Sequence, residues 1–126
     1  HNLGYLFLLI CNFSYTLYQI FYIKHQEVYM NHLNIIATIT VKTEYYAAFQ
    51  PILKKLVEES RKEAGCIHYE LNQSISNPNV YVVIETWASQ AAIDSHNATP
   101  HFVEFATFAK DHVDGLDICV AKPVNF

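Results

Sequence analysis

The chain has 126 residues, a formal net charge of −4 and a pI near 5.9. Hydrophobic residues make up 52% of it, which is enough for the core of one domain and excludes a disordered chain. The acidic balance excludes a nucleic-acid partner, because such partners need clustered lysine and arginine. The three cysteines lack CxxC spacing, which predicts no metal site, no disulfide framework and a reducing compartment. With only three glycines the chain has no glycine-rich phosphate-binding loop, which predicts no nucleotide cofactor.

Residues 1–29 differ in composition from everything after them. Residues 3–23 carry no charge, as in a membrane helix. Four polar residues interrupt this run, namely Asn12, Ser14, Thr16 and Gln19. No basic segment precedes it, so we interpret residues 1–29 as a non-native extension and residues 30–126 as a complete cytoplasmic domain. The alternative is a signal or membrane anchor, with the domain then exported or held at a membrane.

The domain is predicted to open with a strand and a helix. Residues 33–41 are rich in β-branched side chains, as in a central strand that is buried on both faces. Residues 44–64 place apolar side chains at helical spacing and charged ones on the opposite side, which predicts a helix with Gly65 as its C-cap. Pro51 falls inside this pattern and either kinks the helix or marks its true start.

A hairpin and a short helix follow. Residues 66–74 and 80–87 are predicted strands, joined by a turn rich in Asn and Pro. Ser89 is a typical N-cap, so a short helix is expected from there to about His96.

The last two predicted elements are a second helix and a strand. Thr99 followed by Pro100 predicts an N-cap and the first helical residue, and the apolar pattern continues to about His112. Gly115 is expected to stop this helix, and residues 116–124 to form an edge strand. The order βαββαβ predicts an α+β, ferredoxin-like fold with one antiparallel sheet and helices on one face. Because the strands are apolar on both faces, we expect a second copy to cover the open face.

Two histidines and the single tryptophan are expected near one pocket. Trp87 ends the second strand of the hairpin, His96 ends the short helix, and His101 lies in the first turn of the next helix. The helix dipole there disfavours imidazolium, so a neutral His101 could act as general base, with His96 as the second candidate. Equally, both histidines could be solvated helix-end residues, and Trp87 could be a core anchor.

Four further residues are candidates for binding the substrate in this pocket: Tyr69, His68, Phe102 and Phe105. Tyr69 and His68 are neighbours on one strand, so only one of them can face a given side of the sheet. The two phenylalanines are expected in the lining or the core, without a chemical role. Glu85 is interpreted as a structural hydrogen-bond or ion-pair partner rather than a catalytic acid.

Three motifs occur together: Gly65-Cys66-x-x-Tyr69, Glu85-Thr86-Trp87 and His96-x-x-Thr99-Pro100-His101-Phe102. In this order and spacing, the sequence from about residue 30 to residue 124 resembles the antibiotic biosynthesis monooxygenase family of dimeric α/β barrels. It is most similar to the branch that holds quinol monooxygenases and an isomerase of a phosphorylated signal. The resemblance implies a homodimer and no cofactor.

Two other branches of that family match less well. Haem-degrading members have Asn, Trp and His at positions that are here Ile36, His96 and Ala106. Anthrone-oxidising members share the strand Trp but have Asn and Tyr where this chain has Val83 and Ile93. Haem degradation is therefore disfavoured, and anthrones are doubtful substrates.

The reaction implied by the resemblance is an O₂-dependent oxidation of a quinol-like or phenolic small molecule. Triplet O₂ reacts slowly with closed-shell molecules, so without metal or flavin the substrate itself must be the reductant. A base that removes a phenolic proton makes such a substrate electron-rich enough to pass an electron to O₂. Two alternatives remain: an isomerase of a small carbonyl metabolite, and a dimer that binds small molecules without catalysis.

Overall fold

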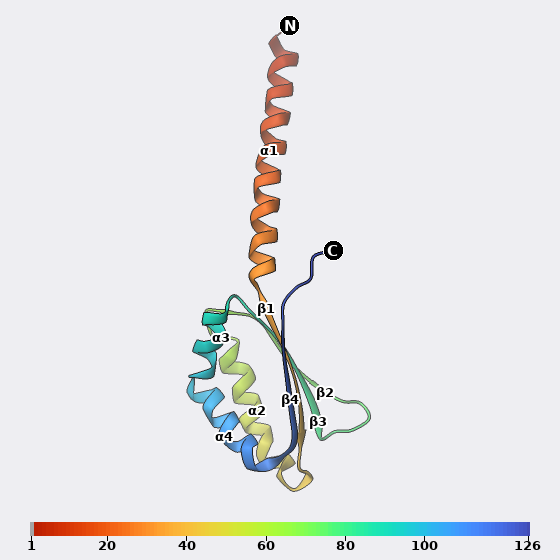
Figure 1. Ribbon diagram of the computed structural model, residues 1–126, viewed down its shortest axis with the longest axis vertical. Helices are drawn as coiled ribbons and strands as arrows, with labels where there is room; N and C mark the ends of the chain where they lie inside the picture. The colour runs from red at the N-terminus through yellow and green to blue at the C-terminus, as the bar shows by residue number, and fades with distance from the viewer. Residues whose placement is uncertain (1) are drawn as a thin grey trace.

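A computed structural model describes residues 2–126 as a four-stranded antiparallel sheet with helices on one face and one long helix projecting away (Figure 1). The elements are α1 (Asn2–Asn31), β1 (Leu33–Val41), the 3₁₀ helix η1 (Thr43–Tyr45), α2 (Tyr46–Ser60), β2 (Cys66–Gln73), β3 (Val80–Trp87), α3 (Gln90–Asn97), α4 (Pro100–His112) and β4 (Val113–Ala121). The strand order is β2-β3-β1-β4. This order confirms the predicted α+β class and the ferredoxin-like topology.

The N-caps of α3 and α4 form as predicted. The Ser89 hydroxyl accepts a hydrogen bond from the backbone N–H of Ala92 at 3.2 Å. The Thr99 hydroxyl accepts one from the N–H of Phe102 at 3.3 Å and donates to the carbonyl of His96 at 2.7 Å. Thr99 therefore starts α4 and also binds the last turn of α3, which fixes the corner between the two helices.

The predicted end of α2 is wrong. The helix stops at Ser60, so Gly65 does not cap it, and Pro51 lies inside the helix rather than at its start. Gly65 has another role, because a Cβ at this position would collide with the Cβ of Ala92 on α3. The missing side chain thus lets the turn before β2 approach α3 closely.

The predicted start of β4 is also wrong. The strand begins at Val113, directly after α4, and Gly115 lies within it rather than before it. Gly115 pairs with Thr40, where the register of β1 and β4 shifts. A glycine at such an irregularity is common in strands, and here it does not break the pairing. β4 ends at Ala121, so Pro123 follows the strand.

The core lies between the sheet and α2, α3 and α4. Its largest fully buried apolar side chains are Trp87, Phe49, Ile39, Leu53 and Val41. The helices leave β4 uncovered. Three side chains of β4 pair with buried residues of β1 and therefore point to the face of the sheet that carries the helices. They nevertheless remain 44–55% exposed, namely Leu116, Ile118 and Val120.

The opposite face of the sheet is mixed rather than uniformly apolar. Ile36 and Ile84 lie opposite each other in the register and are both exposed. Thr38 pairs with Asp117 beside them, and the Thr86 hydroxyl donates to the side-chain oxygen of Asn34.

α1 stands apart from this packed unit. Only His32 separates it from β1, and it points away from the sheet along the longest axis of the molecule (Figure 1). It is long and apolar enough to cross a membrane.

Candidate functional site

A cavity of about 160 Å³ lies between the sheet and the helices. Its wall is mostly apolar and includes side chains of β1, β3, β4, α2 and α4. The exposed β4 side chains form part of this wall, so the cavity opens along β4. An apolar cavity of about 150 Å³ is large enough to bind benzene. The space therefore suits one aromatic ring.

Glu85 places a carboxyl group on this apolar wall. It lies on the inward face of β3 opposite Ile35, and one oxygen accepts a hydrogen bond from the Trp87 indole at 2.9 Å. Burial raises the pKa of Glu85 to about 7, the negative charge of Glu63 adds to this, and the indole hydrogen bond opposes it. At neutral pH the group can therefore both accept and release a proton.

His96 lies beside this carboxyl group in the last turn of α3 and is only 2% exposed. Its ring packs on Trp87 with the ring centroids 4.4 Å apart. Nδ1 lies 2.7 Å from Oε2 of Glu63, and Nε2 lies 4.0 Å from Oε1 of Glu85. Burial lowers the pKa of His96, although the contact with Glu63 opposes the shift. A neutral ring that donates from Nδ1 to Glu63 keeps a free lone pair on Nε2, which is the nitrogen nearer Glu85.

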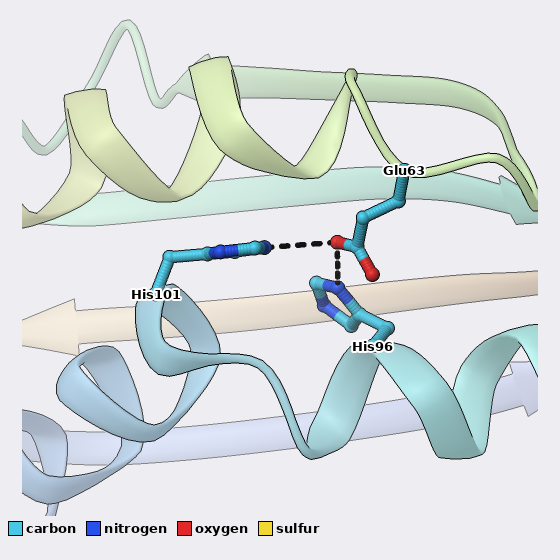
Figure 2. Close-up of side chains that lie close together, drawn as sticks. All are labelled: Glu63, His96 and His101. Atoms are coloured by element: carbon cyan, nitrogen blue, oxygen red, sulfur yellow. Dashed lines mark hydrogen bonds and ion pairs between the residues drawn. The ribbon is translucent and has the colours of Figure 1, made fainter.

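Glu63 joins the two histidines that lie on successive helices. It comes from the turn between α2 and β2, and its Oε2 contacts both Nδ1 of His96 and Nε2 of His101, the latter at 2.9 Å (Figure 2). The three ligand atoms lie within 4.8 Å of one another. Two imidazoles and a carboxylate could also hold a divalent cation such as Zn²⁺.

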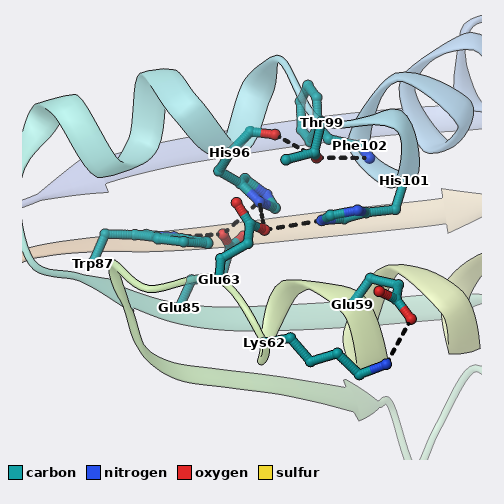
Figure 3. Close-up of polar contacts among 9 residues, drawn as sticks. All are labelled: Glu59, Lys62, Glu63, Glu85, Trp87, His96, Thr99, His101 and Phe102. Atoms are coloured by element: carbon teal, nitrogen blue, oxygen red, sulfur yellow. Dashed lines mark hydrogen bonds and ion pairs between the residues drawn. The ribbon is translucent and has the colours of Figure 1, made fainter.

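The wider view shows how these groups are arranged (Figure 3). Trp87 and His101 lie on opposite sides of His96, and the Glu63 carboxylate lies between the two histidines. Glu59 and Lys62 form a separate ion pair at the surface.

The structure brings most of the sequence-predicted site residues together. Those on the cavity wall are His96, Tyr69, Phe102 and Phe105. Burial also raises the pKa of the Tyr69 phenol, so this group stays protonated. Trp87 is fully buried behind Glu85, and His101 lies beyond Glu63 rather than on the wall. His68 pairs with Thr86 on the opposite face of the sheet and is half-exposed.

Sequence reasoning missed Glu63 and gave Glu85 only a structural role. Glu63 carries no local signal, because its partners lie on other elements. The sequence around Glu85 did carry a local signal. The inward positions of its strand are Tyr81, Val83, Glu85 and Trp87, and a carboxylate in such a buried row is unusual.

Comparisons with known proteins agree with this architecture. The family described as antibiotic biosynthesis monooxygenase matches residues 33–107. A candidate monooxygenase of Bacillus subtilis, YcnE, is 36% identical over 75 residues, which cover 60% of this chain and 79% of that protein.

Two solved structures are similar over most of the chain. A conserved protein from Methanosarcina mazei Go1 has a TM-score of 0.72 and 28% identity, covering 79% of this chain and 99% of that one. A structure described as an antibiotic biosynthesis monooxygenase has a TM-score of 0.70 and 31% identity, covering 74% of this chain and 99% of that one.

Proposed function

The chain belongs to the antibiotic biosynthesis monooxygenase family, as its motifs predicted, and from this we propose that it uses O₂ to oxidise a quinol or another phenolic small molecule. In this proposal the protein supplies a base and a dry cavity, and needs neither metal nor flavin. The observation that carries it is the Glu85 carboxyl group, which titrates near pH 7 on the wall of an apolar cavity.

The reaction starts with loss of a phenolic proton to the Glu85 carboxylate, with Nε2 of His96 as the second acceptor. The phenolate passes one electron to O₂, and the phenoxyl radical and superoxide recombine as a peroxide at a ring carbon. The carboxyl group then returns its proton to the outer peroxide oxygen. The O–O bond breaks as the ring carbon loses its hydrogen as a proton to that leaving oxygen, and the C–H electron pair forms the carbonyl bond. One oxygen atom stays on the ring as a carbonyl, and the other leaves as water.

Two further features support a small aromatic substrate. The cavity volume of about 160 Å³ suits a single ring rather than a polycyclic anthrone or haem. The aromatic side chains of Phe102 and Phe105 on the wall suit a flat apolar ligand.

We assign different roles to the two histidines. His96 lies on the wall and is placed to exchange a proton with the substrate or with Glu85. His101 acts through Glu63 as a positioning residue, because their hydrogen bond holds the carboxylate that orients His96.

A homodimer belongs to this proposal. The cavity opens along β4, where Leu116, Ile118 and Val120 remain exposed, and the opposite sheet face exposes Ile36 and Ile84. A second copy would bury such apolar surface and exclude water from the reaction.

The test is O₂ consumption with a panel of single-ring hydroquinones, using ¹⁸O₂ to follow the oxygen atoms. We expect Glu85→Gln and His96→Gln each to lower kcat by about 100-fold. Glu59→Gln is the matched control, because Glu59 pairs with Lys62 at the surface outside the cavity, and it should retain wild-type kcat. Turnover of a carbonyl substrate without O₂ uptake would instead indicate an isomerase, and binding without any turnover a non-catalytic dimer.

A further inference from the structure

α1 exposes an unusual amount of apolar surface. From Leu3 to Ile23 its large hydrophobic side chains are 47–79% exposed, and this stretch carries no charged residue. Side chains of this kind are normally covered by something else.

The distribution of these side chains indicates what covers them. The apolar residues of α1 are spread around the whole helix and do not form one stripe, unlike those of α2. A protein partner docked on one side would cover only part of such a helix, whereas lipid covers every side. The uncharged stretch is about 30 Å long at 1.5 Å per residue, which matches the hydrocarbon core of a bilayer.

The polar features of α1 also fit a bilayer. The Thr16 hydroxyl donates to the carbonyl of Asn12 at 2.9 Å, so one of the four polar groups in this run is satisfied within the helix. The first charged residue, Lys24, follows the uncharged stretch immediately, where the headgroup region would begin.

The strand register puts the polar end of the cavity next to α1. Leu33, the first residue of β1, pairs with Trp87, and Glu85 pairs with Ile35, only about 7 Å further along the strand. The C-terminal end of β4 lies at the same end of the sheet, because Ala121 pairs with Asn34.

The residues after β4 extend the apolar surface at this end. The C-terminus lies at the same end of the sheet as α1 (Figure 1), and the side chains of Val124 and Phe126 are exposed. Lys122 is exposed beside them and could contact lipid phosphates.

In place of the non-native extension expected from the sequence, we propose the alternative of a membrane anchor: α1 crosses a lipid bilayer and holds the domain at its surface, with the Glu85 end of the cavity nearest the lipid. The substrate is then a quinol dissolved in that bilayer, whose ring reaches the cavity from the membrane side. This identification of the substrate rests on the proposed function, whereas the position of α1 does not.

Flotation with phosphatidylcholine vesicles tests the anchor without any turnover. The full chain, reconstituted from detergent, should float with the vesicles and resist extraction at alkaline pH. Leu9→Arg with Leu17→Arg should lower the floated fraction more than about 100-fold, because each arginine at the centre of a membrane helix opposes insertion. The control is Ile75→Arg, which changes a fully exposed isoleucine outside α1 and should float like wild type. The proposal would be overturned if the wild-type chain failed to float with the vesicles, or if the double-arginine variant floated as wild type does.

Energy transfer tests the orientation with an unaltered α1. Trp87 is the only tryptophan and lies at the α1 end, so it should transfer energy strongly to dansyl-labelled lipid headgroups. In Trp87→Phe with Ile75→Trp, the donor moves to the β2–β3 loop at the far end of the sheet, and transfer should fall. Equal or stronger transfer from residue 75 would overturn the orientation.

Activity then separates this inference from the proposed function. The double-arginine variant should oxidise a water-soluble hydroquinone as wild type does but lose at least about 10-fold in rate on a long-chain quinol held in vesicles. Equal rates on the vesicle-held quinol would overturn delivery from the membrane. Flotation without oxidation of either quinol would overturn the proposed function and leave the anchor in place.

Discussion

The buried carboxyl group of Glu85 links the stability of the domain to pH. Its pKa is about 7 in the folded chain and near 4.5 when unfolded, because burial favours the protonated form. The protonated carboxyl group therefore contributes fully to the stability of the folded chain below about pH 4.5, and this contribution is lost as the pH rises through 7. From pH 4.5 to 8 we expect the free energy of unfolding of wild type to fall by about 3 kcal/mol more than that of Glu85→Gln. Urea unfolding at a series of pH values measures this, and parallel curves would contradict it.

The same titration should shape the pH dependence of turnover. The carboxylate is the proposed base, so kcat should rise about tenfold per pH unit below 7 and level off above it. In Glu85→Gln this limb should disappear along with most of the activity. An unchanged pH profile in the glutamine variant would exclude Glu85 as the group that titrates.

Glu63 is expected to matter for stability because one oxygen serves two imidazoles. Removing it in Glu63→Ala leaves N–H groups of His96 and His101 without their acceptor in a largely buried place. We expect a loss of about 2–4 kcal/mol in the free energy of unfolding. Glu59→Ala is the control, since Glu59 pairs with Lys62 at the surface and should cost less than about 1 kcal/mol. Similar losses in the two variants would contradict this role.

At the scale of the elements, the contact between Gly65 and α3 can be tested by exchanging side chains. Gly65→Ala places its Cβ against that of Ala92 and should destabilise the domain by about 1–3 kcal/mol. Adding Ala92→Gly removes the colliding atom, so the double variant should recover part of this loss in thermal unfolding. Equal stability of the double and the single variant would show that the collision is not the cause.

Local sequence signals predicted the elements that depend on local chemistry. The caps at Ser89 and Thr99 satisfy backbone N–H groups within three residues, and both helices begin where these caps predict. The start of β4 was mispredicted because pairing with β1 overrides the usual effect of Gly115. The end of α2 was mispredicted because Gly65 is selected by its contact with α3 and not by a helix end.

The candidate site was predictable only in part for the same reason. His96, Trp87 and Tyr69 could be placed near one another from strand and helix positions. Glu63 contacts His96, which lies 33 positions later in the sequence, and His101, which lies 38 positions later. No local sequence pattern predicts contacts between residues so far apart. The raised pKa of Glu85 likewise depends on burial by helices that come from other parts of the chain.

At the scale of the whole molecule, the open sheet face predicts self-association. Residues 30–126 should sediment as a dimer, because Ile36 and Ile84 pair on that face and are both partly exposed in the single chain. Ile36→Glu should weaken the dimer at least tenfold, and Ile75→Glu, in an exposed loop, should not. A wild-type monomer at micromolar concentration in the ultracentrifuge would contradict the prediction.

The position of β1 in the sheet also has a consequence for the order in which the protein folds. β1 is central, yet both of its partners come later in the chain: Leu33 pairs with Trp87, and Asn34 pairs with Ala121. During synthesis the strand therefore leaves the ribosome long before its neighbours exist, and among the strand pairs of the described residues only β2–β3 joins consecutive strands. Such long-range pairing makes folding slower than that of a helical bundle, whose contacts are mostly local. α1 thus emerges and can meet its surroundings while the sheet that it carries is still unformed.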